Sequence, residues 1–282
     1  MHRPQFGEID SWGLTHPGKE RATNQDHYFM GGLMSGVKVI SSSLGHEAEE
    51  VAFPVRSATI AVVADGVGSS YGGEHAAQVA VDALVREVAR SFHHAEVVEA
   101  TDPDVFSRLL QDAALACHAS LLGRAEQEPG KGSFSTTLTL FLGLWPHAYI
   151  LQVGDSRAYI YQHDKLTQVT RDQTWAQELI DQGTLSQTKA EASRWANVLS
   201  SSIGGQETTP VVTRIERDWG AILLCCSDGL TKHVSNERIS ELAARMTSAR
   251  QLAEDLLQEA LDGGGSDNIT IIAGRTIPRE DE

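Results

Sequence analysis

Long apolar runs are missing from this sequence. No hydrophobic stretch approaches the roughly 20 residues that span a bilayer, and Met1–Asp10 lacks the apolar segment of a secretion signal. Cysteine is scarce too: there are three, and Cys225 and Cys226 are neighbours in an apolar run, which favours buried thiols over a disulfide framework. We therefore expect a cytoplasmic protein that does not bind membranes.

Positive charge is in short supply. The 282 residues carry 23 Lys and Arg against 38 Asp and Glu, a net charge of −15. This balance disfavours binding to nucleic acid or to an anionic lipid surface, and it fits a site that gathers cations. The 41% hydrophobic and 22% charged residues are typical of a soluble globular protein.

Aspartates, by contrast, lie beside four separate strand-like runs. An apolar run bounded by glycines is typical of a buried strand, and glycine allows a sharp turn or close backbone approach beside the carboxylate. The four runs are Ile60–Gly68, Val153–Arg157, Ala221–Leu230 and Gly263–Ile272, and their aspartates are Asp65, Asp155, Asp228 and Asp267. We predict that these side chains converge on a hard cation.

The hydrophobic spacing predicts helices in pairs between strand runs, which indicates a mixed α+β sandwich rather than a doubly wound parallel sheet. The expected helices cover about 74–90, 104–122, 236–244 and 249–261, and the expected strands cover 136–144, 148–153, 158–161 and 269–273. No internal boundary is visible, so residues 1–282 are predicted to form one domain with a core at about 7–275.

Two polar segments interrupt this pattern. Residues 31–56 are rich in Gly and Ser and predict a loop or loose hairpin inserted between two core strands. Residues 171–209 are weakly periodic, with one short helix expected near Thr174–Gln182, and the rest is interpreted as a mobile surface flap.

Six short motifs follow one another along the chain. They are Arg21-x-x-Asn24-x-Asp26, Ala64–Gly68, Ser135–Thr137, Val153–Arg157, Ser227–Leu230 and Asp267–Asn268. Each is weak alone, but together they resemble the metal-dependent type 2C (PPM) Ser/Thr protein phosphatases of bacterial type, over about residues 7–275. The resemblance implies a four-layered α-β-β-α sandwich of two antiparallel sheets flanked by helix pairs.

The resemblance also implies a two-metal site at one edge of the sandwich. Asp65 would bridge both ions, and the Gly66 carbonyl would bind one of them. Asp228 and Asp267 would bind the other ion. Carboxylate and carbonyl oxygens suit Mn²⁺ or Mg²⁺, whereas zinc prefers His and Cys.

Three further residues receive implied roles. Asp26 would hold metal-bound waters, Arg21 would clamp the substrate phosphate, and Asp155 would bind a third, weaker ion. Two ions would activate a bridging water for in-line attack on phosphoserine or phosphothreonine, and a guanidinium suits bidentate contact with phosphate. The expected partners are proteins that a Ser/Thr kinase has phosphorylated, and we expect the chain to be a monomer.

Some positions depart from the family pattern. Gln25 replaces a common Glu, Val67 replaces a histidine that acts as general acid in animal members, and Asp172-Gln173 replaces Asp-His. For Thr136 and Thr137, a role in the site and a role as ordinary β-branched strand residues are equally compatible with the sequence.

Two other functions remain open. One is a phosphoprotein-binding protein without turnover, which loss of a ligand aspartate would favour. The other is a structural Ca²⁺ protein, which the absence of an Asp-x-Asp-x-Asp-Gly run disfavours.

Overall fold

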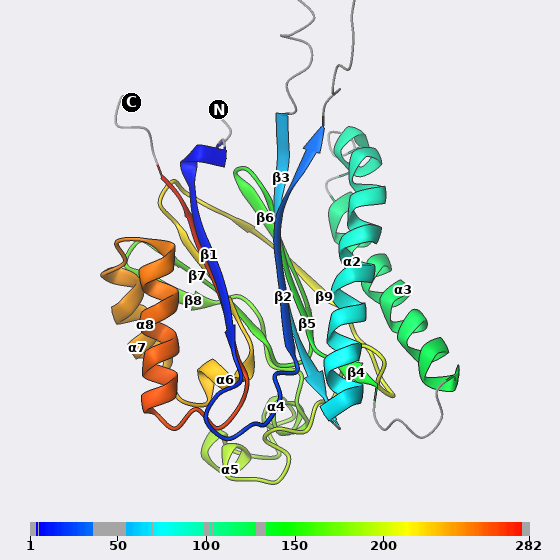
Figure 1. Ribbon diagram of the computed structural model, residues 1–282, viewed down its shortest axis with the longest axis vertical. Coiled ribbons are helices and arrows are strands. Elements are labelled where there is room, and N and C mark those ends of the chain that lie inside the picture. Colours follow the sequence, from blue (N-terminus) through cyan, green and yellow to red (C-terminus); the bar gives the residue numbers. More distant parts are fainter. Residues whose placement is uncertain are drawn as a thin grey trace, which may run out of the picture.

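The computed structural model describes residues 4, 6–35, 55–68, 70–98, 102, 104–127 and 134–277. Two antiparallel sheets pack face to face, and a pair of helices covers the outer face of each (Figure 1). The predicted four-layered α-β-β-α sandwich is therefore confirmed.

The first sheet has five strands, and every neighbouring pair is antiparallel. Its spatial order is β1 (Ile9–His16), β11 (Ile269–Thr276), β10 (Ile222–Cys226), β7 (Arg157–Gln162) and β8 (Lys165–Gln168). The outer helices on this side are α7 (Asn236–Ala244) and α8 (Ala249–Asp262). A short 3₁₀ helix, η1 (Phe6–Glu8), precedes β1.

The second sheet has six strands, also antiparallel. Its order is β2 (Asp26–Ser35), β3 (Val55–Val67), β5 (Leu138–Leu144), β6 (His147–Val153) and β9 (Val211–Glu216), with β4 (Ser135–Thr136) paired to the end of β3. Helices α2 (Ser70–Val98) and α3 (Val105–Gln127) cover its outer face.

Apolar side chains fill three layers of core. One lies between α2, α3 and the second sheet, another between α7, α8 and the first sheet, and a smaller one between the two sheets. All seven residues of β5 are buried because one face meets helices and the other meets the first sheet. This double burial explains why the strand sequences are continuous apolar runs and not alternating ones.

Helix α2 is longer at both ends than the sequence predicted. It begins at Ser70 instead of Glu74 and continues to Val98 instead of Arg90. Phe92 and Ala95 keep the same buried face beyond the predicted end. Helices α7 and α8 agree closely with the predicted ranges, whereas α3 continues to Gln127 instead of ending at Leu122.

The predicted strand 136–144 is divided in two. β4 ends at Thr136 and β5 begins at Leu138, because Thr136 exchanges backbone hydrogen bonds with Ile203 while the Thr137 N–H donates to the Asp65 carbonyl. The first strand pair also extends into the expected insertion: β2 reaches Ser35 and β3 starts at Val55. The rest of the predicted 31–56 loop, residues 36–54, lies outside the described residues.

The predicted flap, 171–209, lies beside the lower sheet edge in Figure 1 and contains two helices. The expected helix is α4 (Trp175–Asp181), and α5 (Gln187–Glu191) was not predicted. Ile203 and Ala190 are fully buried, and Ile203 exchanges backbone hydrogen bonds with Thr136. Burial of Ile203 and its backbone hydrogen bonds to Thr136 thus attach this part of the segment to the sandwich.

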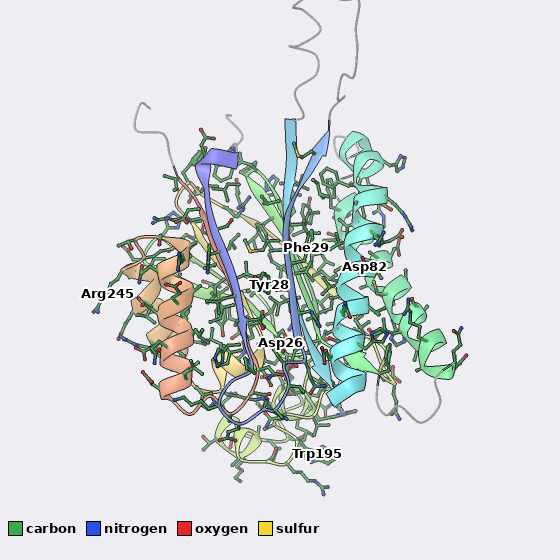
Figure 2. The ribbon with its side chains drawn as sticks, in the orientation of Figure 1. Asp26, Tyr28, Phe29, Asp82, Trp195 and Arg245 are labelled. Atoms are coloured by element: carbon green, nitrogen blue, oxygen red, sulfur yellow. The ribbon has the colours of Figure 1, made fainter. Side chains whose placement is uncertain are left out.

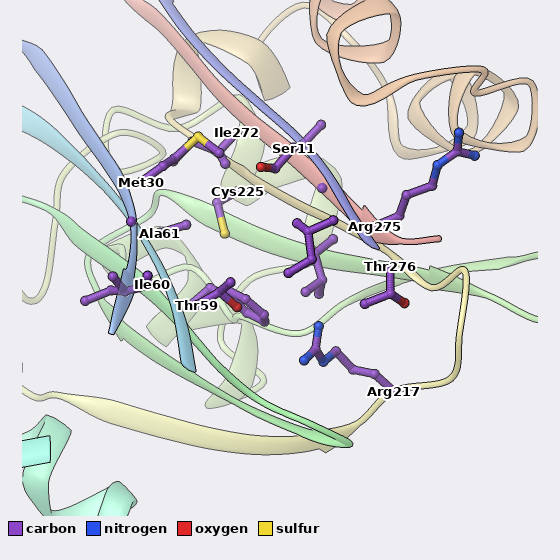
Figure 3. Close-up of a pocket in the computed structure, with 17 residues that line it drawn as sticks. Ser11, Met30, Thr59, Ile60, Ala61, Arg217, Cys225, Ile272, Arg275 and Thr276 are labelled. Carbon is purple, nitrogen blue, oxygen red and sulfur yellow. The ribbon is translucent and has the colours of Figure 1, made fainter. Parts of the chain in front are cut away.

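The sheets separate at the end of β1–β3 that is remote from this flap. There, a cavity of about 240 Å³ lies between them, lined mainly by small and apolar residues (Figure 3). Thr59 and Ala61 face Cys225 and Ile272 across it, and the Arg217 guanidinium packs over the Phe141 ring. Within the described chain, no helix combines the length and the apolarity that crossing a membrane requires.

Candidate active site

The predicted aspartates meet at one edge of the sandwich. Asp65 is near the end of β3, Asp155 lies between β6 and β7, Asp228 begins the short helix α6 (Asp228–Thr231), and Asp267 precedes β11. These four line one cleft of about 240 Å³, together with the predicted residues Arg21 and Gly66.

Asp26, the seventh predicted residue, lies behind the cleft. It starts β2, where Figure 2 labels it, and the strand register places it directly opposite Asp65 on β3. Its side chain is buried, and the Ser227 hydroxyl donates a 2.7 Å hydrogen bond to its Oδ2. Its other oxygen, Oδ1, has no hydrogen-bond partner among the described residues.

Two glycines allow backbone segments around the cleft to approach one another closely. A Cβ on Gly229 would lie 1.9 Å from the carbonyl oxygen of Asn268, and one on Gly66 would lie 2.2 Å from the carbonyl oxygen of Gly73. Both contacts are far shorter than a side chain tolerates. The glycines that follow Asp65 and Asp228 are therefore needed because the neighbouring backbone passes directly over them.

Two threonines hold the backbone of Asp65. The Thr136 hydroxyl donates to the Asp65 carbonyl at 2.8 Å, and the Thr137 hydroxyl accepts from the Asp65 N–H at 3.0 Å. The Thr137 N–H also donates to that carbonyl at 2.9 Å. The sequence left both threonines open as plain strand residues, whereas the structure shows that they fix the position of Asp65.

Two residues at the start of the flap, Asp172 and Gln173, hydrogen-bond the turn that carries Asp155. Arg157 donates two hydrogen bonds to Asp172, at 2.8 and 2.7 Å. The Gln173 side chain accepts from the Gly154 N–H at 2.8 Å and donates to the Thr209 carbonyl at 2.9 Å. The carboxamide that departs from the family pattern thus ties the start of the flap to the loop that carries Asp155.

Asp26, Asp65 and Asp155 make no ion pair within the described part of the chain. Burial, and then the neighbouring carboxylates, raise the pKa of Asp65 and Asp155 well above the usual value. Burial likewise raises the pKa of Asp228, against the opposing effect of Lys232, and it raises the pKa of Asp26 to about 7. Ionising this cluster is unfavourable without an added cation.

Asp267 differs because two cations hold it. Arg21 contacts both of its oxygens, at 2.8 and 2.9 Å, and Lys232 Nζ lies 2.7 Å from Oδ2. Burial alone would raise the pKa of Asp267, but the hydrogen bonds from Lys232 and Arg21 hold it below the usual value. Arg21 is therefore in the cleft as predicted, where it pairs with a carboxylate.

Sequence reasoning assigned no role to three residues that shape this cleft: Ser227 and Asn268 lay within the quoted motifs, and Lys232 was not singled out. Asn268 donates to the carbonyls of Pro17 and Thr23, at 3.0 and 2.9 Å, and so fixes the loop that carries Arg21. Ser227 orients Asp26, and Lys232 lies among the acidic groups. The signal for Lys232 was its spacing of four residues from Asp228, which places both on one side of a helical turn.

The donor set fits a hard divalent cation. It consists of carboxylates and backbone carbonyls, and Oδ1 of Asp228, like that of Asp26, has no hydrogen-bond partner within the described chain. In the ranges that the structure describes, no three acidic, His or Cys side chains enclose an ion by themselves. Carbonyl and water ligands would have to complete any coordination shell.

Comparison with known proteins agrees with this geometry. Residues 52–263 match the family profile described as protein phosphatase 2C. The chain belongs to the protein phosphatase 2C family.

Its relatives include bacterial enzymes. The serine/threonine protein phosphatase PstP of Mycobacterium tuberculosis is 31% identical over 78% of this chain, which spans only 41% of that protein. Protein phosphatase PhpP of Streptococcus pneumoniae is 30% identical over 76% of this chain and 84% of its own length. A crystal structure of the PstP catalytic domain with two manganese ions superposes with a TM-score of 0.69 at 25% identity, covering 96% of this chain and 99% of that one.

Proposed function

We propose that this chain is a metal-dependent phosphatase that hydrolyses phosphoserine and phosphothreonine on proteins. The observation that carries the proposal is the convergence of four aspartates from separate strand ends, Asp65, Asp155, Asp228 and Asp267, on one cleft. Membership of the phosphatase family and the manganese-containing structure of PstP support it.

Four groups would hold two core ions. Asp65 would bind both of these ions, the Gly66 carbonyl would complete one site, and Asp228 and Asp267 would form the other. Asp26, buried behind Asp65, would hold water with its Oδ1, and Asp155 would bind a third, weaker ion. Two Mn²⁺ or Mg²⁺ ions bound there would supply Lewis acidity and an activated water.

The protein's own groups would position the substrate. Arg21 is half exposed at the rim of the cleft, so its guanidinium could contact phosphate oxygens from the open side while its inner face meets Asp267. Val67 also lines the cleft, and its hydrocarbon side chain has no acidic proton with which to protonate the leaving serine or threonine oxygen. We propose that protonation comes from water held near Asp155.

The biological setting belongs to the same proposal. The substrates would be proteins phosphorylated by a Ser/Thr kinase, and the chain would act as a cytoplasmic monomer with one catalytic domain. The net charge of −15 supports a site that takes up cations and argues against nucleic acid as a partner.

The test is turnover of a phosphothreonine peptide with Mn²⁺. Asp65→Asn should reduce kcat by about a hundredfold or more, because an amide cannot supply the charge that two ions share. Asp82→Asn is the control: Asp82 lies exposed on α2, and the variant should keep full activity. Binding of the phosphopeptide without any turnover by the unmodified protein would instead establish a phosphoprotein-binding function.

A further inference from the structure

Lys232 places a positive charge between two of the proposed metal ligands. It caps the C-terminus of α6, and its Nζ lies 2.6 Å from Asp228 Oδ2 and 2.7 Å from Asp267 Oδ2. Asp228 begins α6 and Asp267 precedes β11, and one ammonium contacts both. A divalent ion bound by both carboxylates would occupy this same region.

The ammonium is held within the cleft and does not lie on the open surface. The Lys232 side chain is 27% exposed, against 52% for Arg21, the other cation of the cluster. Lys232 is also tethered, because it lies only one helical turn from Asp228 along the chain. Arg21 is half exposed at the rim, whereas the Lys232 ammonium lies within the cleft beside Asp228.

The oxygens of Asp267 are already occupied by cations. Arg21 contacts Oδ1 and Oδ2, and Lys232 contacts Oδ2. Ions such as Mn²⁺ and Mg²⁺ bind carboxylate oxygens at about 2.0–2.2 Å, so an ion on Oδ2 would lie close to an ammonium bound to the same atom. Repulsion between the two charges would be strong in a partly buried site.

We propose that Lys232 is a tethered cation that competes with a divalent ion for Asp228 and Asp267, and so sets the metal concentration at which this half of the site fills. The inference rests on the proposed function, since it takes Asp228 and Asp267 as ligands of one ion. In the absence of metal, the ammonium stabilises the acidic cluster. When the ion binds, the flexible lysine stem swings aside and its carboxylate contacts are lost.

The competition makes two separable predictions for Lys232→Gln. Without the positive charge, Mn²⁺ should bind about tenfold or more tightly, an effect of the size expected for one unit charge beside a divalent ion. In EDTA, the variant should melt at a lower temperature than the unmodified protein, because Asp228 and Asp267 then repel each other without a cation between them. Saturating Mn²⁺ should remove or reverse that difference.

The experiment is Mn²⁺ titration by calorimetry, with thermal unfolding in EDTA and in Mn²⁺, on the full chain. Lys165→Gln is the matched control, because it removes the same charge from an exposed position on β8 outside the cleft. Its Mn²⁺ affinity should equal that of the unmodified protein. Phosphothreonine peptide turnover is measured in parallel.

The outcomes separate the two proposals. If the unmodified protein binds Mn²⁺ and turns over the peptide, but Lys232→Gln binds Mn²⁺ equally or more weakly, the competition is overturned and the phosphatase function stands. If only Lys232→Gln binds Mn²⁺, the competition is supported in its strongest form. If neither protein binds Mn²⁺, the metal-dependent function fails, and the competition fails with it.

Discussion

Gly229→Ala should damage both the stability and the metal site of this protein. The added methyl group would lie 1.9 Å from the Asn268 carbonyl oxygen, whereas an ordinary contact begins near 3.4 Å. The loops that carry Asp228 and Asp267 would have to separate by about 1.5 Å at that point. The two nearest atoms, the Asn268 carbonyl oxygen and carbon, belong to the backbone, so the strain falls on the backbone.

The size of the effect follows from this displacement. Forcing an extra methyl into a packed site costs about 1–3 kcal/mol, and a backbone obstacle puts the cost near the upper end. For a domain of this size, that loss lowers Tm by about 5 °C. Metal-ligand distances tolerate only about 0.2 Å, so the ion shared by Asp228 and Asp267 should bind much more weakly.

Gly123→Ala is the matched control for this substitution. Gly123 lies within α3, and a Cβ there would meet nothing within 4 Å. Because alanine is favoured over glycine in a helix interior, this variant should gain about 0.5–1 kcal/mol. Urea unfolding and Mn²⁺ titration of both variants are the assays. A Gly229→Ala protein with unchanged stability and Mn²⁺ affinity would refute the argument that close backbone contact builds the site.

Two further predictions address the third ion and the core. Asp155→Asn should lose far more activity on phosphothreonine, a poor leaving group, than on an activated aryl phosphate; equal losses on both substrates would remove Asp155 from leaving-group protonation. All three cysteines are buried, and burial raises the pKa of Cys117 and Cys225 to about 12. A thiol reagent at pH 8 should therefore label none of them in the native protein and three in urea, because the thiolate forms only in the unfolded chain; rapid native labelling would contradict this packing.

The sequence predicts the cleft well because its features are local. An apolar run followed by Asp-Gly specifies a buried strand, a carboxylate at its end and a glycine over which backbone passes, as Gly229 shows. The positions of Asp65 and Asp228 at strand ends therefore follow from the amino-acid pattern alone, and the fold confirms them. Their role as metal ligands remains a prediction until metal binding is measured.

The remaining features depend on partners distant in sequence. The break in the strand at Thr137 arises from hydrogen bonds to Asp65 and from the pairing of Thr136 with Ile203, neither of which periodicity reveals. The burial of Ala190 and Ile203 makes part of the flap a packed element, although its sequence is polar. The bridge from Lys232 to Asp267 joins residues 35 positions apart, so only the tertiary fold exposes it.

Metal removal tests the central claim most directly. The protein is treated with excess EDTA, assayed on a phosphothreonine peptide, and then supplied with Mn²⁺, Mg²⁺ or Zn²⁺. A carboxylate and carbonyl site predicts complete loss of turnover in EDTA, recovery with Mn²⁺ or Mg²⁺, and none with Zn²⁺. Full turnover in excess EDTA would contradict the proposed mechanism.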